Sequence, residues 1–223
     1  MDICGEKVTA MATIDLNSGV LSEHLASAAA ALKDGYVIVA PLENSYALVA
    51  DAFFHDAVRA LHVLRGDELG ISAQVMIGSS AAVDGIAREI SEPVRKLIDN
   101  FWPGQLSINL KPQRGLNWDL GDGQQLDSFS VRVPSADFIL QLAKMHGPLA
   151  VASAALAGHS PITDPSDLKF TELEVAAIFS IGPIAQGLAT TVVAGDSEPA
   201  RIVRVGAISA EQITAIAPNI SAP

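Results

Sequence analysis

The chain has 223 residues, 49% of them hydrophobic and 5% aromatic, which is enough for one domain with a mainly aliphatic core. Its 14 basic and 25 acidic residues give a net charge of −11, which disfavours direct RNA or DNA binding because affinity for phosphate backbones comes largely from Lys and Arg. No apolar run is long enough to cross a bilayer, and residues 1–18 lack the apolar core of a secretory signal. Cys4 is the single cysteine, which excludes an internal disulfide. We therefore expect a cytoplasmic protein without a membrane segment.

The predicted elements begin after a short N-terminal segment. Residues 1–17 are expected to form a flexible leader and residues 18–217 a single domain. Apolar residues at helical spacing and short β-branched runs follow one another along the first half of the chain. The elements that these patterns predict are, in order, helix 21–32, strand 36–42, helix 51–64, strand 74–78 and helix 92–101. The last helix is expected to end sharply, because Pro103 disfavours helical backbone at the residue before it.

The second half continues with strands, loops and shorter helices. Its predicted elements are strand 106–110, strand 128–133, helix 136–146, strand 149–153, helix 171–179, strand 190–193, strand 202–205 and a short helix from residue 209. Residues 113–125 are rich in Gly, Asp and Asn and are expected to form an exposed loop, and residues 158–167 hold two prolines and predict turns. Because strands and helices mix without a regular βαβ repeat, the pattern predicts one α/β domain with a mixed sheet.

Familiar catalytic motifs are absent from the sequence. It has no phosphate loop ending in Gly-Lys-Ser/Thr, no Gly-x-Gly-x-x-Gly after a strand and no Gly-x-Ser-x-Gly nucleophile motif. His55 and His62 are spaced to share one helix face, but no acidic partner stands at metal-ligand spacing, so no metal site is predicted. Composition and periodicity alone name no activity.

Six short segments follow one another in a defined order between about residues 20 and 215. The first two are Pro41-Leu-Glu-Asn-Ser-Tyr-Ala-Leu48 and Phe101-Trp-Pro-Gly-Gln-Leu106. The other four are Val131–Pro134, Ala152–Gly158, Thr190–Val193 and Arg201–Ile208. Together they resemble the YrdC/Sua5 family, in which the first two read Pro-Thr-Glu-Thr-Val-Tyr-Gly-Leu and Phe-Trp-Pro-Gly-Pro-Leu. One such match is weak, whereas six in the same order indicate common ancestry.

The resemblance implies a fold and a reaction. The fold is YrdC/RibB-like: a single α/β domain with a twisted mixed β-sheet, flanking helices and a concave ligand-binding face. The reaction is that of a threonylcarbamoyl-AMP synthase, which makes L-threonylcarbamoyladenylate and pyrophosphate from L-threonine, bicarbonate and ATP, with Mg²⁺ accompanying the ATP. The product serves the t6A37 modification of tRNA through a separate transferase, so proteins of the t6A pathway are the expected partners.

The resemblance also assigns candidate site residues. Arg65 and Arg132 are the expected catalytic cations, because a guanidinium offers two parallel donors to a carboxylate or phosphate. Glu43 and Tyr46, together with Arg132, are expected to shape the threonine pocket. Hydroxyl donors and one further cation are expected at the nucleotide: Ser128, Ser153, Thr190, Thr191 and Arg204. Each has an ordinary structural alternative, namely an ion pair for an arginine and backbone hydrogen bonds for a hydroxyl.

The sequence departs from the family at positions where ligand charge is met. Leu64 and Gly66 stand in place of the two cations of a Lys-x-Arg motif, with Arg65 between them. A threonine, a glycine and an asparagine of the family are replaced by Leu42, Ala47 and Ala155. Because a hydrogen bond to a charged group contributes about 1.5–3 kcal/mol, several such losses weigh heavily. Three functions therefore stay open: an active synthase, a catalytically impaired homologue that binds a nucleotide or small metabolite or acts as a regulatory partner, and a related ligase with another acceptor.

Overall fold

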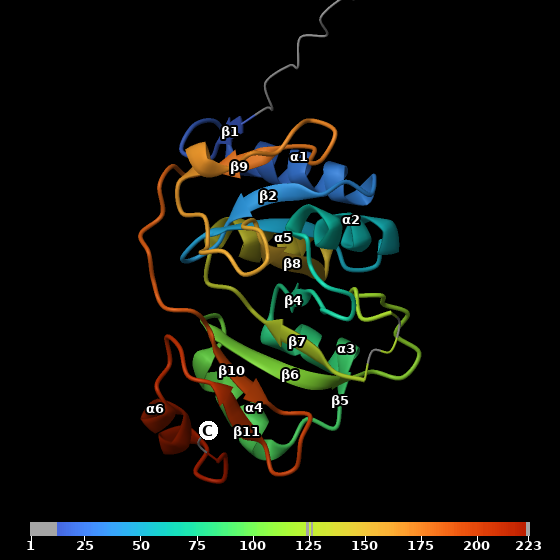
Figure 1. Ribbon diagram of the computed structural model, residues 1–223. Helices are drawn as coiled ribbons and strands as arrows, with labels where there is room; N and C mark the ends of the chain where they lie inside the picture. Colours follow the sequence, from blue (N-terminus) through green and yellow to red (C-terminus); the bar gives the residue numbers. More distant parts are fainter. Residues whose placement is uncertain (1–12, 124, 126, 222–223) are drawn as a thin grey trace, which may run out of the picture.

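The computed structural model describes residues 13–123, 125 and 127–221, and within them one twisted sheet runs the length of the molecule (Figure 1). Its strands are β1 (Thr13–Asp15), β2 (Ile38–Pro41), β3 (Tyr46–Asp51), β4 (Gln74–Met76), β5 (Ala87–Arg88), β6 (Leu106–Pro112), β7 (Phe129–Arg132), β8 (Leu149–Ser153), β9 (Ile178–Ser180), β10 (Thr191–Ala194) and β11 (Arg201–Arg204). Their order is β1-β9-β2-β3-β8-β4-β7-β6-β10-β11, with β5 paired to β6. Parallel pairs such as β4–β7 adjoin antiparallel pairs such as β3–β8, which confirms the predicted mixed α/β sheet.

Helices cover both faces of this sheet. They are α1 (Leu21–Lys33), α2 (His55–Arg65), α3 (Val83–Ile86), α4 (Glu92–Phe101), α5 (Asp137–His146) and α6 (Ala210–Ile216), with short 3-10 turns η1 (Ser80–Ala82) and η2 (Pro165–Asp167). Successive side chains of a strand point to opposite faces. In β2, Val39 accordingly joins the apolar cluster that includes α2, α4 and α6, whereas Ile38 and Ala40 join the cluster that includes α1 and α5.

Local signals explain where several elements begin and end. α4 spans the predicted residues 92–101, with Ser91 at its N-cap and a proline in its first turn. α6 begins at a capping box, in which the Ser209 hydroxyl accepts from the Gln212 N–H and the Gln212 side chain accepts from the Ser209 N–H. α2 ends where Gly66 adopts a left-handed backbone with φ of 65°.

The helix predicted over 171–179 is wrong. Thr171 and Glu174 form a single turn, because the Glu174 carboxylate accepts hydrogen bonds from both the N–H and the hydroxyl of Thr171. The chain then extends into β9, which lies between β1 and β2. Ile178 and Phe179 are buried on opposite faces of the sheet, which is the alternation of a strand. The stretch therefore begins like a helix but is held as a strand by its neighbours.

Two further expectations need correction, and one central strand was not predicted. Residues 13–15 of the expected 1–17 leader form β1, which pairs in parallel with β9, while residues 1–12 lie outside the described residues. The loop expected to be exposed over 113–125 buries Trp118 and Leu120. β3, between β2 and β8, was not predicted, and it carries part of the first motif.

Candidate functional site

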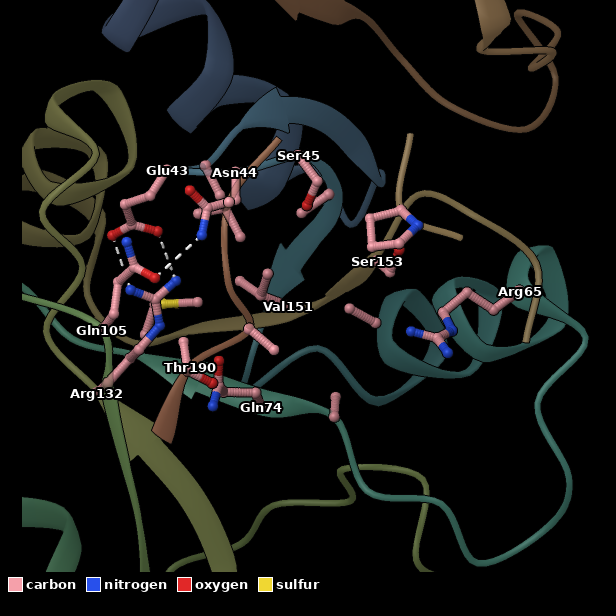
Figure 2. A pocket seen from close by; sticks show the side chains of 18 of the residues that line it. Glu43, Asn44, Ser45, Arg65, Gln74, Gln105, Arg132, Val151, Ser153 and Thr190 are labelled. Atoms are coloured by element: carbon pink, nitrogen blue, oxygen red, sulfur yellow. Dashed lines mark hydrogen bonds and ion pairs between the residues drawn. The ribbon is translucent and has the colours of Figure 1, made fainter. Parts of the chain in front are cut away.

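A cavity of about 600 Å³ opens beside the middle strands of the sheet. Its walls come from the β2–β3 turn, from strands β4, β7 and β8, from the C-terminal end of α2 and from the segment before β10. Figure 2 shows Glu43, Gln105 and Arg132 gathered at one end of this cavity and Arg65 at the other, with Ser153 between them. The cavity is therefore elongated, with polar groups at both ends.

Glu43 and Arg132 form a buried ion pair at the first end. Arg132 Nη1 and Nη2 lie 2.8 Å from Glu43 Oε1 and Oε2, and the two side chains are 3% and 11% exposed. Burial by itself raises the pKa of Glu43, but the hydrogen bonds and charge of Arg132, with backbone N–H donors, outweigh it and lower that pKa to about 2. Arg132 Nε is buried and has no hydrogen-bond partner among the described residues.

An amide pair closes the same end of the cavity. Asn44 Nδ2 donates to Gln105 Oε1 at 3.0 Å and to the Leu188 carbonyl at 2.7 Å. A Cβ on Gly187 would lie 2.3 Å from Asn44 Oδ1, so this close approach needs a glycine. Neither amide was predicted as a site residue, although both replace family residues inside the first two motifs.

A chain of hydrogen-bonded polar side chains runs beside the cavity from β4 to β11, and its members Gln74, Thr190 and Arg204 line the cavity. Gln74 Nε2 donates to the Ser107 and Ser130 hydroxyls at 2.7 and 3.1 Å, and Ser107 donates to Thr190 Oγ1 at 3.2 Å. Arg204 completes the chain, because its guanidinium donates to both the carbonyl and the hydroxyl of Thr190. Thr190 and Arg204 thus line the cavity as expected, and Gln74 is an addition that the sequence did not single out.

The second end of the cavity holds His62, Arg65 and Asp67. Asp67 accepts from Arg65 Nε at 3.1 Å and lies 2.8 Å from His62 Nδ1. Arg65 and Arg132 were both expected to be catalytic cations, but the structure separates them to opposite ends of the cavity (Figure 2). Each of the two is already paired with a carboxylate.

Three of the expected residues do not line the cavity. Tyr46 is fully buried and donates its hydroxyl hydrogen to the Gly182 carbonyl at 2.6 Å, so it belongs to the core rather than to the pocket floor. Thr191 is also buried. Its hydroxyl donates to the Ile208 carbonyl and accepts from the N–H groups of Gly206 and Ile208. Ser128 instead donates to the Asp196 carboxylate.

The departures from the family fall in different places. Leu42 and Ala47 line the cavity, whereas Leu64 and Ala155 line a separate hollow of about 530 Å³. Gly66 makes the left-handed turn that ends α2. Replacement of the Lys-x-Arg motif has thus turned one cation position into an apolar contact and the other into a helix stop.

Metal-binding groups are sparse in the part of the chain that the structure covers. Among residues 13–123, 125 and 127–221, no three His, Cys, Asp or Glu side chains gather as a metal ion requires. Glu43 and Asp67, the two carboxylates that line the cavity in the described residues, each form an ion pair with an arginine. Within the same described ranges, no helix has the length and apolar character needed to span a membrane.

The sheet and its elongated cavity, with polar groups at both ends, define an α/β protein with a pocket beside the middle strands of one mixed sheet. Residues 30–206 match the family model for Sua5, YciO and YrdC, which is described as "Telomere recombination", and the chain belongs to this family. The family assignment made from the six motifs is therefore confirmed.

Relatives of known name agree with this assignment. A putative threonylcarbamoyl-AMP synthase of Mycobacterium tuberculosis is 32% identical over 87% of this chain and 89% of its own length, and that of Mycobacterium leprae is 34% identical over 86% and 87%. These names denote enzymes of the nucleotidyltransferase type. Among solved structures, Sua5 of Pyrococcus abyssi complexed with L-threonine superposes with a TM-score of 0.84 at 24% identity, covering 96% of this chain and 63% of that one. Escherichia coli YciO superposes at 0.76 with 21% identity, over 91% and 97%. These structures confirm the fold.

Proposed function

We propose that the chain is a threonylcarbamoyl-AMP synthase, which makes L-threonylcarbamoyladenylate and pyrophosphate from L-threonine, bicarbonate and ATP. The observation that carries the proposal is the elongated cavity with an arginine at each end, in a chain about one-third identical to mycobacterial proteins of that name. Two anionic groups at opposite ends of one ligand set, a carboxylate and a phosphate, match this distribution of cations.

The proposed reaction has two steps. The threonine amine adds to bicarbonate with loss of water and forms a carbamate, and the carbamate oxygen then attacks the α-phosphorus of ATP as the bond to pyrophosphate breaks. Such transfers depend on positioning and on stabilisation of charge more than on covalent help from the protein. ATP enters as its Mg²⁺ complex with the ion held by the phosphates, because the carboxylates of the cavity are engaged by arginines.

The cavity residues divide between the proposed substrates. Arg132 binds the threonine carboxylate at the end closed by Glu43, and Arg65 binds phosphate at the other end. Ser153, Thr190 and Arg204 supply hydroxyl and guanidinium donors to the nucleotide. The product then serves the t6A37 modification of tRNA in the cytoplasm, through partner proteins of that pathway.

The test is a synthesis assay with purified protein, ATP, L-threonine and labelled bicarbonate. The expected result is a labelled adenylate and an equal amount of pyrophosphate, both dependent on threonine. Failure to form product, together with failure to support growth of a synthase-deficient cell, contradicts the proposal. Calorimetry that shows ATP binding without turnover supports the impaired homologue instead. The replacement of the two cations of Lys-x-Arg by Leu64 and Gly66 is the reason to test for this outcome.

A further inference from the structure

The second end of the cavity is built by the turn that closes α2. Gly66 donates its N–H to the Val63 carbonyl and Asp67 donates to the His62 carbonyl, at 3.1 Å each, which is the hydrogen-bond pattern of a Schellman motif. The left-handed backbone at Gly66 brings the Asp67 side chain back against the helix that it has just left. Asp67 therefore contacts His62 through both its backbone and its carboxylate.

His62 holds this carboxylate from a fixed position. Its Nδ1 lies 2.8 Å from Asp67 Oδ2, and its Nε2 lies 2.8 Å from the Leu120 carbonyl. Both oxygens are acceptors only, so each contact is a hydrogen bond that the ring nitrogen donates. A Cβ on Gly121 would lie 2.2 Å from Nε2, so the loop reaches the ring only because a glycine follows Leu120. The His62 and Asp67 side chains are 13% and 4% exposed.

Asp67 uses its remaining oxygen on Arg65. Oδ1 accepts from Arg65 Nε at 3.1 Å, which leaves both Nη groups with no hydrogen-bond partner within the described part of the chain. Figure 2 shows the Arg65 guanidinium extending from α2 toward the middle of the cavity. The edge formed by the two Nη groups, which can bind an anion through two parallel hydrogen bonds, is therefore free.

We propose that Asp67, anchored by His62, is a positioning residue that fixes the free edge of Arg65 for a phosphate group of the bound nucleotide. This inference rests on the proposed function for the presence of a nucleotide. Asp67 is an anion near an anion site, so its field alone weakens phosphate binding. If it acts by orienting Arg65, its removal weakens phosphate binding nonetheless.

The test is a double-mutant cycle on pyrophosphate binding, measured by calorimetry for the wild type, R65Q, D67N and the double variant. R65Q is expected to weaken binding about tenfold or more, since a charge-assisted hydrogen bond is lost. D67N is expected to weaken it severalfold and to have no further effect in the R65Q background, because its role passes through Arg65. Tighter or unchanged binding by D67N, or losses that multiply in the double variant, overturns the proposal.

A matched control comes from another histidine–aspartate pair. Asp51 Oδ2 lies 3.0 Å from His146 Nε2, and neither residue lines the cavity, so D51N removes a similar pair without changing pyrophosphate affinity. If D67N does not fold, H62Q takes its place, since it removes the anchor alone and is expected to weaken binding in the same direction; unchanged binding by H62Q then overturns the proposal.

Pyrophosphate binding also separates this inference from the proposed reaction, because it needs no turnover. Coupling between Arg65 and Asp67 in a protein that makes no adenylate supports the inference and contradicts the reaction. Adenylate synthesis by a protein without this coupling supports the reaction and contradicts the inference.

Discussion

Arg132 and Glu43 are joined by two parallel hydrogen bonds of 2.8 Å, and through them β7 is tied to the turn between β2 and β3. Glu43 Oε1 also accepts from the N–H groups of Ser135 and Ala136, the residues that lead into α5. One carboxylate therefore fixes a strand end, a turn and a helix start around the same end of the cavity.

Neutralising Glu43 is expected to destabilise the fold. E43Q leaves the Arg132 guanidinium buried without a counter-charge, and loss of one partner of a buried pair costs about 3 kcal/mol or more. Urea denaturation measures the cost. The double variant E43Q/R132M is expected to recover part of it, because no unpaired charge then stays buried. Equal additive losses from the two substitutions contradict this account.

The same pair predicts how stability depends on pH. The folded-state pKa of Glu43 is about 2 against an ordinary value of 4.5, so its contribution is fully present above about pH 4.5 and is lost as the pH falls toward 2. The side chain is largely buried, and the shift corresponds to a contribution on the order of 3 kcal/mol. Urea denaturation across this range is expected to show a steeper acid loss in the wild type than in E43Q. Asp51, whose pKa is also lowered, contributes equally to both proteins. Parallel curves contradict the prediction.

Sequence patterns predicted the fold best where the signals are local. α4 and β8 match their predicted bounds, because the caps, proline and apolar run that define them lie within a few residues. The failure over 171–179 has a different cause. Its Thr171–Glu174 turn starts like a helix, but the Ala177 carbonyl accepts a hydrogen bond from the Val39 N–H of β2. No residue close in sequence predicts this pairing between distant segments.

The site was predicted in part for a related reason. The resemblance placed Glu43, Arg65, Arg132, Ser153, Thr190 and Arg204, all of which line the cavity. It did not separate Thr190 from Thr191, because strand register alone decides which of two neighbouring hydroxyls faces the cavity and which the core. The partnership of His62 with Asp67 depends on the turn at Gly66, for which the glycine at the helix end was the available signal.

The close packing of Gly78, which follows β4, against α5 predicts a sharp contrast between two glycines. A Cβ on Gly78 would lie 2.6 Å from the backbone N and Cα of Lys144, so G78A is expected to push α5 outward and cost about 1–3 kcal/mol. Gly85 in α3 has no atom within 4 Å of its Cβ position, and G85A is expected to be neutral or to stabilise by up to about 1 kcal/mol. Thermal unfolding of both variants compares them. Similar losses at both positions contradict the packing argument.

Arg204 provides a test of the nucleotide contacts in the proposed function. It lines the cavity and donates to the Thr190 carbonyl at 3.0 and 3.2 Å, and it has no carboxylate partner among the described residues. R204Q is expected to weaken ATP binding about tenfold, since a charge-assisted contact and the orientation of Thr190 are lost together.

Arg201 begins the same strand, is exposed and does not line the cavity, so R201Q removes an equal charge as the control. Calorimetry is expected to show ATP affinity unchanged in R201Q and lowered in R204Q, with the difference from the wild type shrinking at high salt because Arg204 is accessible to solvent. Equal losses in the two variants indicate a general effect of net charge and contradict a specific contact.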